Sequence, residues 1–208
     1  MIKLLAIGDS HLPRRVKSVP DLIIKKLEQL VKVDKFDYTF FTGDVVNAPS
    51  FMNFLNLITK RNLFVVIGNM DYYGGNRDAP VYRSLKISMG NNDNLIIGLT
   101  HGHQISPRGD RSQLELIAIE KSFNILISGH THKEEIFLQK DLLLLNPGSV
   151  TGAWSFVASG NPSFITLSII EKTGEINVIL YQYDKRAAKL KDLKSFFVFE
   201  NNKIRYKY

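Results

Sequence analysis

All five histidines of this 208-residue chain stand in short motifs together with Asp, Asn or Gly. In chain order the motifs are GDSH (8–11), GD (43–44), GN (68–69), HGH (101–103) and GHTH (129–132). Imidazole nitrogens with carboxylate and amide oxygens suit borderline divalent ions such as Mn²⁺, Fe²⁺, Zn²⁺ or Ni²⁺. One H-x-H motif alone is weak evidence, because turns and surface histidines also produce it. The whole ordered series favours a metal site.

Each motif follows a short apolar segment that is typical of a buried strand, and its glycine allows a tight turn before the polar residues. The expected strands are 2–8, 37–41, 63–68, 94–100, 123–129 and 141–146. Apolar residues at helical spacing predict helices over 20–32, 49–60 and 111–123. Strand–helix alternation indicates an α/β fold with parallel pairing in its first half. Because loops at the carboxyl ends of parallel strands converge on one crevice, we expect the motifs to meet there.

The second half of the chain favours hairpins. Segments 163–171 and 175–183 flank the turn KTG, and SFFVFENNKIRYKY (195–208) has the same pattern. The sheet is therefore expected to become mixed. Residues 70–94 are the most irregular stretch and are expected to form a surface loop with one short strand. Since no linker or repeat interrupts the chain, we expect a single domain over 1–208.

Composition and charge exclude some classes of protein. The absence of cysteine excludes disulfides and thiolate metal sites. Much of the net charge of +7 lies in the C-terminal hairpin, about 184–208, which holds eight Lys or Arg against three Asp or Glu. We interpret this hairpin as a solvated basic edge, with contact to nucleic acid or anionic lipid as the alternative. No specific nucleic-acid partner is expected, because no nucleic-acid-binding motif accompanies the charge.

The ordered series of motifs resembles the calcineurin-like metallophosphoesterase superfamily. Segments HGHQISPRGD (101–110), ILISGHTHK (125–133) and NPGSVTGAW (146–154) are similar to one branch of it. That branch includes the retromer sorting subunit and small archaeal and bacterial phosphodiesterases. The resemblance covers nearly the whole chain and implies an α/β fold, an αββα sandwich of two mixed β-sheets flanked by helices.

The resemblance also implies two divalent metal ions, with Mn²⁺ expected first and Zn²⁺, Fe²⁺, Ni²⁺ or Mg²⁺ as alternatives. The residues that it assigns are Asp9, His11 and His132 for the first ion, Asn69, His101 and His130 for the second, and Asp44 between them. A carboxylate suits the bridging position because it offers two oxygens and a negative charge. Such a pair of ions can activate water and neutralise charge on a phosphoryl group.

Two residues are expected to take part in catalysis, and one more lies near the site. Asp44 would act through the ions, and His103 is a candidate phosphate contact or general acid. The alternative for His103 is a supporting histidine that only orients its neighbours. Asn146, in the motif NPGS, is interpreted as a turn residue close to the site.

Some positions depart from the patterns of this branch. Asp44 and Asn69 stand as in catalytic relatives, whereas retromer subunits commonly exchange these roles. Met70 stands where strong catalysts carry a histidine, and a thioether cannot donate a proton to a poor leaving group. Ser106 and Arg108 stand where the retromer subunit presents apolar residues to its helical-solenoid partner. Because interface cores are depleted in charge, that contact is in doubt here.

Two functions stay open. The first is a metal-binding, retromer-like scaffold subunit in protein sorting or vesicle transport. Its expected location is cytoplasmic, at endosomal or other membranes through partners, with peripheral rather than integral association because the run LLLL (142–145) cannot span a bilayer. The second is a divalent-metal-dependent phosphodiesterase, weakened by Met70, that hydrolyses phosphate esters. A contiguous apolar patch beside the site would favour the scaffold, and an open polar groove the enzyme.

Overall fold

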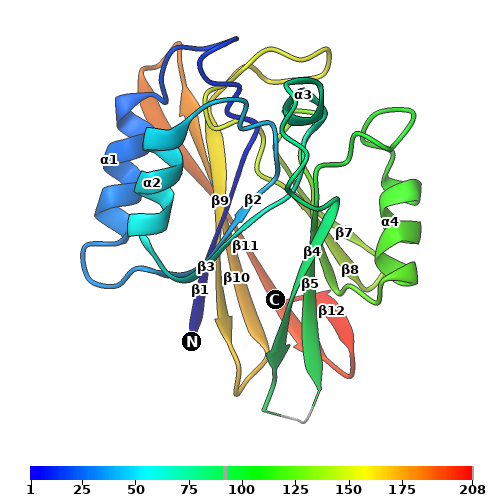
Figure 1. Ribbon diagram of the computed structural model, residues 1–208. Helices are drawn as coiled ribbons and strands as arrows, with labels where there is room; N and C mark the ends of the chain where they lie inside the picture. Colours follow the sequence, from blue (N-terminus) through cyan, green and yellow to red (C-terminus); the bar gives the residue numbers. More distant parts are fainter. Residues whose placement is uncertain (91–92, 208) are drawn as a thin grey trace.

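The computed structural model, which describes residues 1–90 and 93–207, contains two sheets packed face to face (Figure 1). The larger sheet consists of β1 (Ile2–Ile7), β2 (Phe36–Phe41), β3 (Thr59–Val65), β9 (Ser163–Ile170), β10 (Glu175–Asp184), β11 (Lys189–Glu200) and β12 (Lys203–Tyr206). The smaller sheet consists of β4 (Tyr82–Ser88), β5 (Asn94–Thr100), β6 (Ile125–Ile127), β7 (Glu135–Gln139) and β8 (Leu142–Asn146). Their strand orders are β12-β11-β10-β9-β1-β2-β3 and β4-β5-β6-β8-β7.

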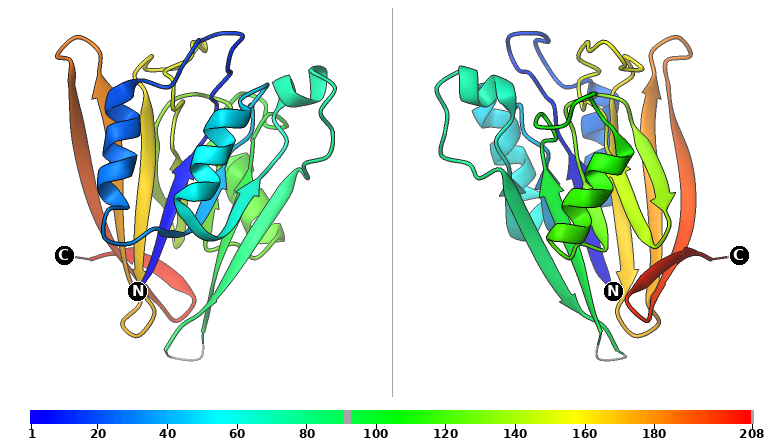
Figure 2. Two further views of the ribbon diagram at one scale, coloured as in Figure 1. Left: turned by 60° about the vertical axis from the view of Figure 1, so that its left-hand side comes forward. Right: turned by 90° about the vertical axis from the view of Figure 1, so that its right-hand side faces the viewer.

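Helices cover the outer faces of both sheets. Helices α1 (Asp21–Leu30) and α2 (Pro49–Leu57) pack on the larger sheet, and α4 (Arg111–Glu120) packs on the smaller sheet (Figure 2). A short helix, α3 (Asn69–Tyr73), lies among the loops at one end of the sandwich. The expected αββα sandwich of two mixed sheets is confirmed.

Alternation along the central strands builds the layers. In β1, Leu4 and Ala6 point between the sheets, whereas Leu5 packs under α1 and α2. In β8, Leu143 points between the sheets and Leu144 packs under α4. Successive side chains of a strand point to opposite faces, so a strand buried on both faces must be apolar throughout. This explains the continuous apolar runs in the sequence.

Parallel pairing places the polar motifs at one edge. Strand β1 pairs in parallel with β2 and antiparallel with β9, and β5, β6 and β8 are parallel to one another. The loops after β1, β2, β5 and β6 gather at the upper end of the sandwich as drawn in Figure 1. The expectation that parallel strand ends bring the motifs together is confirmed within each sheet, and the packing of the two sheets brings the two sets side by side.

Several expected boundaries were wrong. The three predicted helices are shorter, and Thr59 and Lys60, placed in a helix, begin β3 instead. The irregular stretch 70–94 contains most of α3 and a seven-residue strand, β4, whose antiparallel pairing with β5 the local sequence does not show. Strand β7 was not predicted, because its half-buried residues give no clear alternation. Residues 91 and 92 of the expected loop and residue 208 of the expected hairpin lie outside the described residues.

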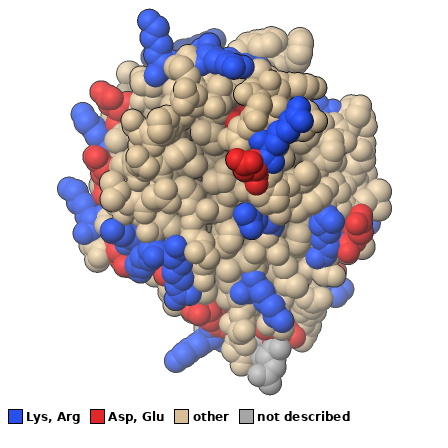
Figure 3. Space-filling view, viewed as in Figure 1, with Lys and Arg blue, Asp and Glu red and all other residues tan. Residues whose placement is uncertain are grey.

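The basic C-terminal hairpin forms as predicted, with β12 pairing antiparallel with the end of β11. On the face drawn in Figure 3, Lys and Arg side chains are spread over the surface rather than gathered in one patch. In the part of the chain that the structure describes, no helix is both long and apolar enough to cross a membrane.

Candidate metal centre

Polar side chains from both sheets converge where the two sheets meet. The residues are Asp9 and His11 after β1, Asp44 after β2, Asn69 at the start of α3, His101 and His103 after β5, and His130 and His132 after β6. The backbone N–H of His130 donates to both carboxylate oxygens of Asp9, at 3.3 and 3.2 Å, across the junction of the sheets. The candidate site thus depends on sheet packing and not on any one loop.

The first group of residues is dense and buried. Ligand atoms of Asp9, His11, Asp44 and His132 all lie within 4.8 Å of one another. The Nε2 atoms of His11 and His132 are 2.9 Å apart, and Nε2 of His132 is 3.4 Å from Oδ1 of Asp9. Two donors at right angles, each ~2.1 Å from one ion, would lie ~3 Å apart. The spacing therefore fits a single cation held by these side chains.

Backbone carbonyls fix two of the rings so that their free nitrogens face inward. Nδ1 of His132 lies 2.8 Å from the carbonyl oxygen of Ala153, and Nδ1 of His101 lies 2.7 Å from that of Thr42. A carbonyl oxygen only accepts, so both Nδ1 atoms carry the proton and each neutral ring keeps a lone pair on Nε2. Metal-binding histidines are usually oriented in this way. Facing lone pairs need a proton or cation between them, which supports the fit to a metal.

The second group is looser, and Asp44 joins it to the first. Nε2 of His101 is 3.1 Å from the side-chain oxygen of Asn69, and the rings of His101 and His130 have centroids 5.0 Å apart. Oδ2 of Asp44 is 3.3 Å from Nε2 of His11 and 3.6 Å from Nε2 of His101. One carboxylate oxygen therefore faces both groups, as a bridging ligand must.

Burial and neighbouring charges shift the pKa values of the cluster. Burial lowers the pKa of His11 and of His130 to about 3, so both rings are neutral. Burial raises the pKa of Asp44 to about 6, although His101 opposes the shift. Burial disfavours charge on Asp9 and His132 as well, but each charge favours the other, so the Asp9 pKa is lowered and the His132 pKa is raised. The cluster thus favours one bound positive charge beside Asp9.

The expected ligands themselves, more than the glycines before them, take up the tight turns. Asp9 and His11 have φ 49°, Asp44 55°, His130 66° and His132 58°. This left-handed conformation costs roughly 1–2 kcal/mol for a residue with a Cβ, and such strain collects at functional sites. Among the glycines of the motifs, Gly43 and Gly102 also have positive φ, 94° and 92°, as expected, whereas Gly68 and Gly129 are needed for close approach. A Cβ on Gly68 would overlap Oδ1 of Asp44, and one on Gly129 would overlap Oδ2 of Asp9.

Asp71 is a buried positioning residue that the sequence analysis missed. Its carboxylate accepts the backbone N–H groups of Asp44 at 2.8 Å, Val46 at 2.7 Å and Gly68 at 3.1 Å. These bonds hold the strained loop around Asp44. The signal in the sequence was an acidic residue in the first turn of a helix that follows GN, where a capping carboxylate is common.

The remaining expected residues have distinct places. Asn146 is buried and acts as a turn residue, since its side-chain oxygen accepts the N–H of Gly148 at 2.9 Å. Its amide also donates to the carbonyl oxygen of Gly129 at 3.0 Å, which steadies the GHTH loop. His103 is exposed, with its ring centroid 5.5 Å from that of His101. The backbone N–H of Met70 donates to Oδ1 of Asp44 at 2.8 Å, so Met70 helps to hold Asp44 in place independently of its side chain.

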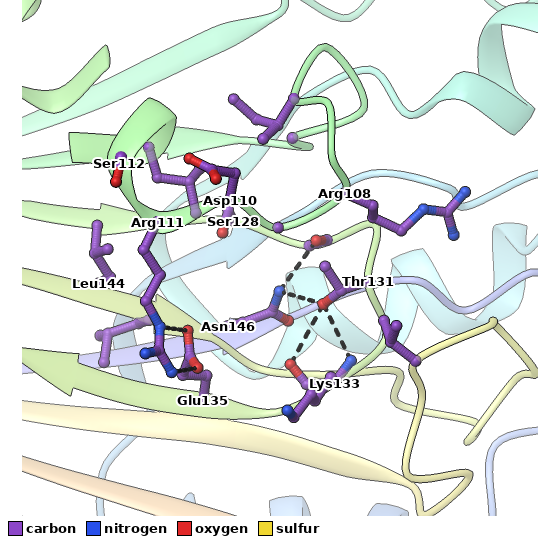
Figure 4. A pocket seen from close by; sticks show the side chains of 17 residues that line it. Arg108, Asp110, Arg111, Ser112, Ser128, Thr131, Lys133, Glu135, Leu144 and Asn146 are labelled. Atoms are coloured by element: carbon purple, nitrogen blue, oxygen red, sulfur yellow. Dashed lines mark hydrogen bonds and ion pairs between the residues drawn. The ribbon is translucent and has the colours of Figure 1, made fainter. Parts of the chain in front are cut away.

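A cavity of about 440 Å³ lies beside the cluster, between the two H-x-H loops and the start of α4 (Figure 4). The middle residues of both motifs, Gly102 and Thr131, line it, but none of the seven expected ligands does. Arg111 on one wall is paired with Glu135, with 2.5 Å between the nearest atoms. Arg108 belongs to the rim, and its side chain extends away from the cavity in Figure 4. The cavity is therefore a neighbour of the ligand cluster and not its mouth.

Most of the chain matches a known sequence family. Residues 2–172 match the model of the calcineurin-like phosphoesterase superfamily domain. A probable metallophosphoesterase of Methanothermobacter thermautotrophicus is 32% identical over 145 residues, which cover 70% of this chain and 75% of the relative.

Solved structures agree over nearly the whole chain. Vacuolar Protein Sorting 29 (Vps29) from Cryptosporidium parvum is 30% identical with a TM-score of 0.78, and the match covers 95% of this chain and 98% of that one. Wild-type Vps29 from Entamoeba histolytica, in complex with Zn²⁺, is 29% identical with a TM-score of 0.75 and coverage of 93% and 99%. An archaeal phosphodiesterase at 19% identity, with a TM-score of 0.53, shares the fold.

Proposed function

This chain belongs to the calcineurin-like phosphoesterase superfamily, and we propose that it is a divalent-metal-dependent phosphodiesterase. The observation that carries the proposal is the position of Asp44, whose Oδ2 faces His11 of one group and His101 of the other. A buried carboxylate shared between two sets of inward-facing imidazoles is the arrangement that two-metal hydrolysis requires. The cost of burying that charge is best explained by cations on both sides.

We assign the ligands as two sets that share Asp44. They are Asp9, His11 and His132 for one ion and Asn69, His101 and His130 for the other, with Mn²⁺ as the expected metal. When bound, two such ions activate water and neutralise charge on a phosphoryl group. The set of neutral imidazoles, two carboxylates and one amide suits a borderline divalent ion.

Other side chains of this protein would handle the substrate. His103 is exposed at the edge of the second group, where it can reach a leaving-group oxygen. Burial lowers the pKa of His103, and the neighbouring His101 adds to the shift. The protonated form of His103, which a general acid needs, is therefore disfavoured. Met70 supplies no proton either. Esters with good leaving groups are therefore expected to react fastest.

The test is hydrolysis of bis-p-nitrophenyl phosphate by metal-stripped protein titrated with Mn²⁺. We expect activity that rises with Mn²⁺ and falls in His101→Ala by more than the ~10–100-fold typical of losing a supporting partner. Asp184→Ala, which removes a carboxylate in a remote turn, is the matched control and should retain full activity. Bound metal without turnover of this activated ester would contradict the proposal.

A second candidate is a retromer-type scaffold subunit. Similarity to Vps29 over 95% of this chain supports it, together with exposed aromatic side chains near the cluster, Trp154 and Phe156. In this role the protein would bind a helical-solenoid partner and act on the cytoplasmic side of endosomal or other membranes. Arg108 would lie in the contact and weaken it. Co-purification with such a partner, lost on placing charge at Trp154 but not at Leu193, would support this function.

A further inference from the structure

One extended segment ties the cluster to two arginines. The carbonyl oxygen of Ala153 accepts Nδ1–H of His132 at 2.8 Å. The next carbonyl oxygen, of Trp154, accepts a guanidinium N–H of Arg15 at 3.0 Å, and the hydroxyl of Ser155 accepts one from Arg108 at 3.0 Å. Consecutive residues thus hold a ligand and two cations in fixed relation.

The same segment exposes two aromatic rings. Ala153 and Ser155 are buried, whereas Trp154 is 66% exposed and Phe156 is 83% exposed. The two rings contact each other edge to face, with centroids 4.8 Å apart and an interplanar angle of 63°. Single exposed apolar residues need no explanation, but a contacting pair beside a polar cluster is typical of a binding site. The buried residues fix the segment while the rings remain available.

The two arginines flank the cluster and lack an acidic partner. Among residues 1–90 and 93–207, no carboxylate lies within 4.0 Å of the guanidinium of Arg15 or Arg108. The backbone N–H of Arg15 donates to the carbonyl oxygen of His11 at 3.0 Å, and Nη1 of Arg108 lies 3.5 Å from the carbonyl oxygen of His130. Each arginine therefore lies beside a residue of a different ligand group.

We propose that segment 153–156 selects phosphodiesters that carry a nucleobase or similar aryl group. The phosphate would lie at the cluster between Arg15 and Arg108, whose planar guanidinium groups suit phosphate oxygens. The base would stack on the aromatic pair, and stacking accepts any base because each has a π-face. The proposal rests on the proposed function only in placing a phosphodiester at the cluster.

The chain offers a local reporter for this binding. Trp154 is its only tryptophan, so fluorescence excited where tryptophan absorbs and tyrosine does not reports on this segment. Mn²⁺-loaded protein is mixed rapidly with the thymidine dinucleotide TpT, and the signal is read before turnover. Diethyl phosphate, which has the diester without a base, and thymidine, which has the base without a phosphate, are the matched ligands. We expect saturable quenching by TpT, and binding weaker by tenfold or more for either fragment.

Two variants keep the reporter and remove one contact each. Phe156→Ala is expected to weaken TpT binding roughly tenfold, the order of one lost stacking partner, and Arg108→Met to weaken it by a similar factor. Phe196→Ala removes an exposed ring on β11, and Arg205→Met removes a cation on β12; both should leave the affinity unchanged. Thymidine that quenches as tightly as TpT, or TpT binding that Arg108→Met does not weaken, would show that the segment recognises no phosphate and would overturn the proposal.

The phosphodiesterase proposal and the proposal for segment 153–156 can be contradicted by different results. Hydrolysis of bis-p-nitrophenyl phosphate without any quenching by TpT would leave the phosphodiesterase standing and exclude the recognition segment. Saturable quenching that depends on Arg108 and Phe156, without hydrolysis of any diester, would leave a nucleotide-binding site and exclude catalysis.

Discussion

The two proposed ligand groups of this protein differ in how completely the fold forms them. Asp9, His11 and His132 are buried, and their ligand atoms crowd together with one oxygen of Asp44. In the other group, Asn69 and His130 are only half-buried and the ring centroids of His101 and His130 are 5.0 Å apart. The first group also contains a full carboxylate, Asp9, where the second contributes the neutral amide of Asn69. We therefore expect one tight site and one weaker site that opens towards the substrate.

The difference follows from where each group lies in the fold. Asp9 and His132 lie at the junction of the two sheets, where packing leaves no freedom. Asn69 lies at the start of α3, a five-residue helix among loops. A preformed cluster binds its ion without the entropic cost of loop ordering, whereas a looser group must order side chains on binding.

The largest expected effect is the loss of metal binding when the bridging residue and one further proposed ligand are removed. Asp44→Ala combined with His130→Ala should abolish binding of the ~2 Mn²⁺ per chain that a two-metal site holds. Elemental analysis after gel filtration measures this, and circular dichroism checks that the variant is folded. Two Mn²⁺ per chain in this variant would show that the ligand assignment is wrong.

Single histidine substitutions should separate the groups. His132→Ala is expected to lose the tight ion, because it removes a ring that is 2.9 Å from His11 and fixed by Ala153. His130→Ala should lose only the weaker ion. Titration calorimetry with Mn²⁺ distinguishes one remaining tight site from one remaining weak site. Loss of the same ion in both variants would contradict the division into one tight and one weaker site.

A smaller effect is expected at Asp71. In Asp71→Asn an amide N–H replaces one oxygen and meets a backbone N–H of the loop around Asp44, which weakens the hold on that ligand. We expect metal affinity to fall ~10–100-fold, the usual cost of losing a supporting partner. Asp184→Asn is the control, because Asp184 also accepts two backbone N–H groups, of Arg186 and Ala187, but far from the cluster. Similar Mn²⁺ affinity in both variants would remove Asp71 from the site.

The smallest effect on metal binding is expected at His103. Its ring is exposed, and His103→Ala should leave Mn²⁺ content unchanged. If His103 acts on the leaving group, hydrolysis of methyl phenyl phosphate should slow by ~10²–10⁴-fold, the usual range for general acid–base catalysis, and that of bis-p-nitrophenyl phosphate much less. Equal slowing of both esters would assign His103 to phosphate contact rather than to proton transfer.

Local sequence patterns were enough to predict which residue types line the candidate site and in what order they occur along the chain. Each motif follows an apolar strand, and neighbouring parallel strands end at one edge, so the local pattern was enough to place Asp9 beside Asp44 and His101 beside His130. That these two pairs meet each other follows from the packing of one sheet on the other. The burial of β1 and β8 was likewise visible in their continuous apolar runs. Element ends and the pairing of β4 with β5 were not, because they depend on partners distant in the chain.

How the proposed ligands are held depends on hydrogen bonds from segments that are distant in the chain. The tautomers of His101 and His132 depend on carbonyl oxygens of Thr42 and Ala153, which no local spacing places near those rings. The left-handed backbone of the ligands, the grip of Asp71 on the loop around Asp44, and the segment that links His132 to two arginines are long-range results of packing. The identity of a side chain is local information. Its hydrogen-bond partners, its burial and its backbone strain depend on which distant loops come into contact when the two sheets pack.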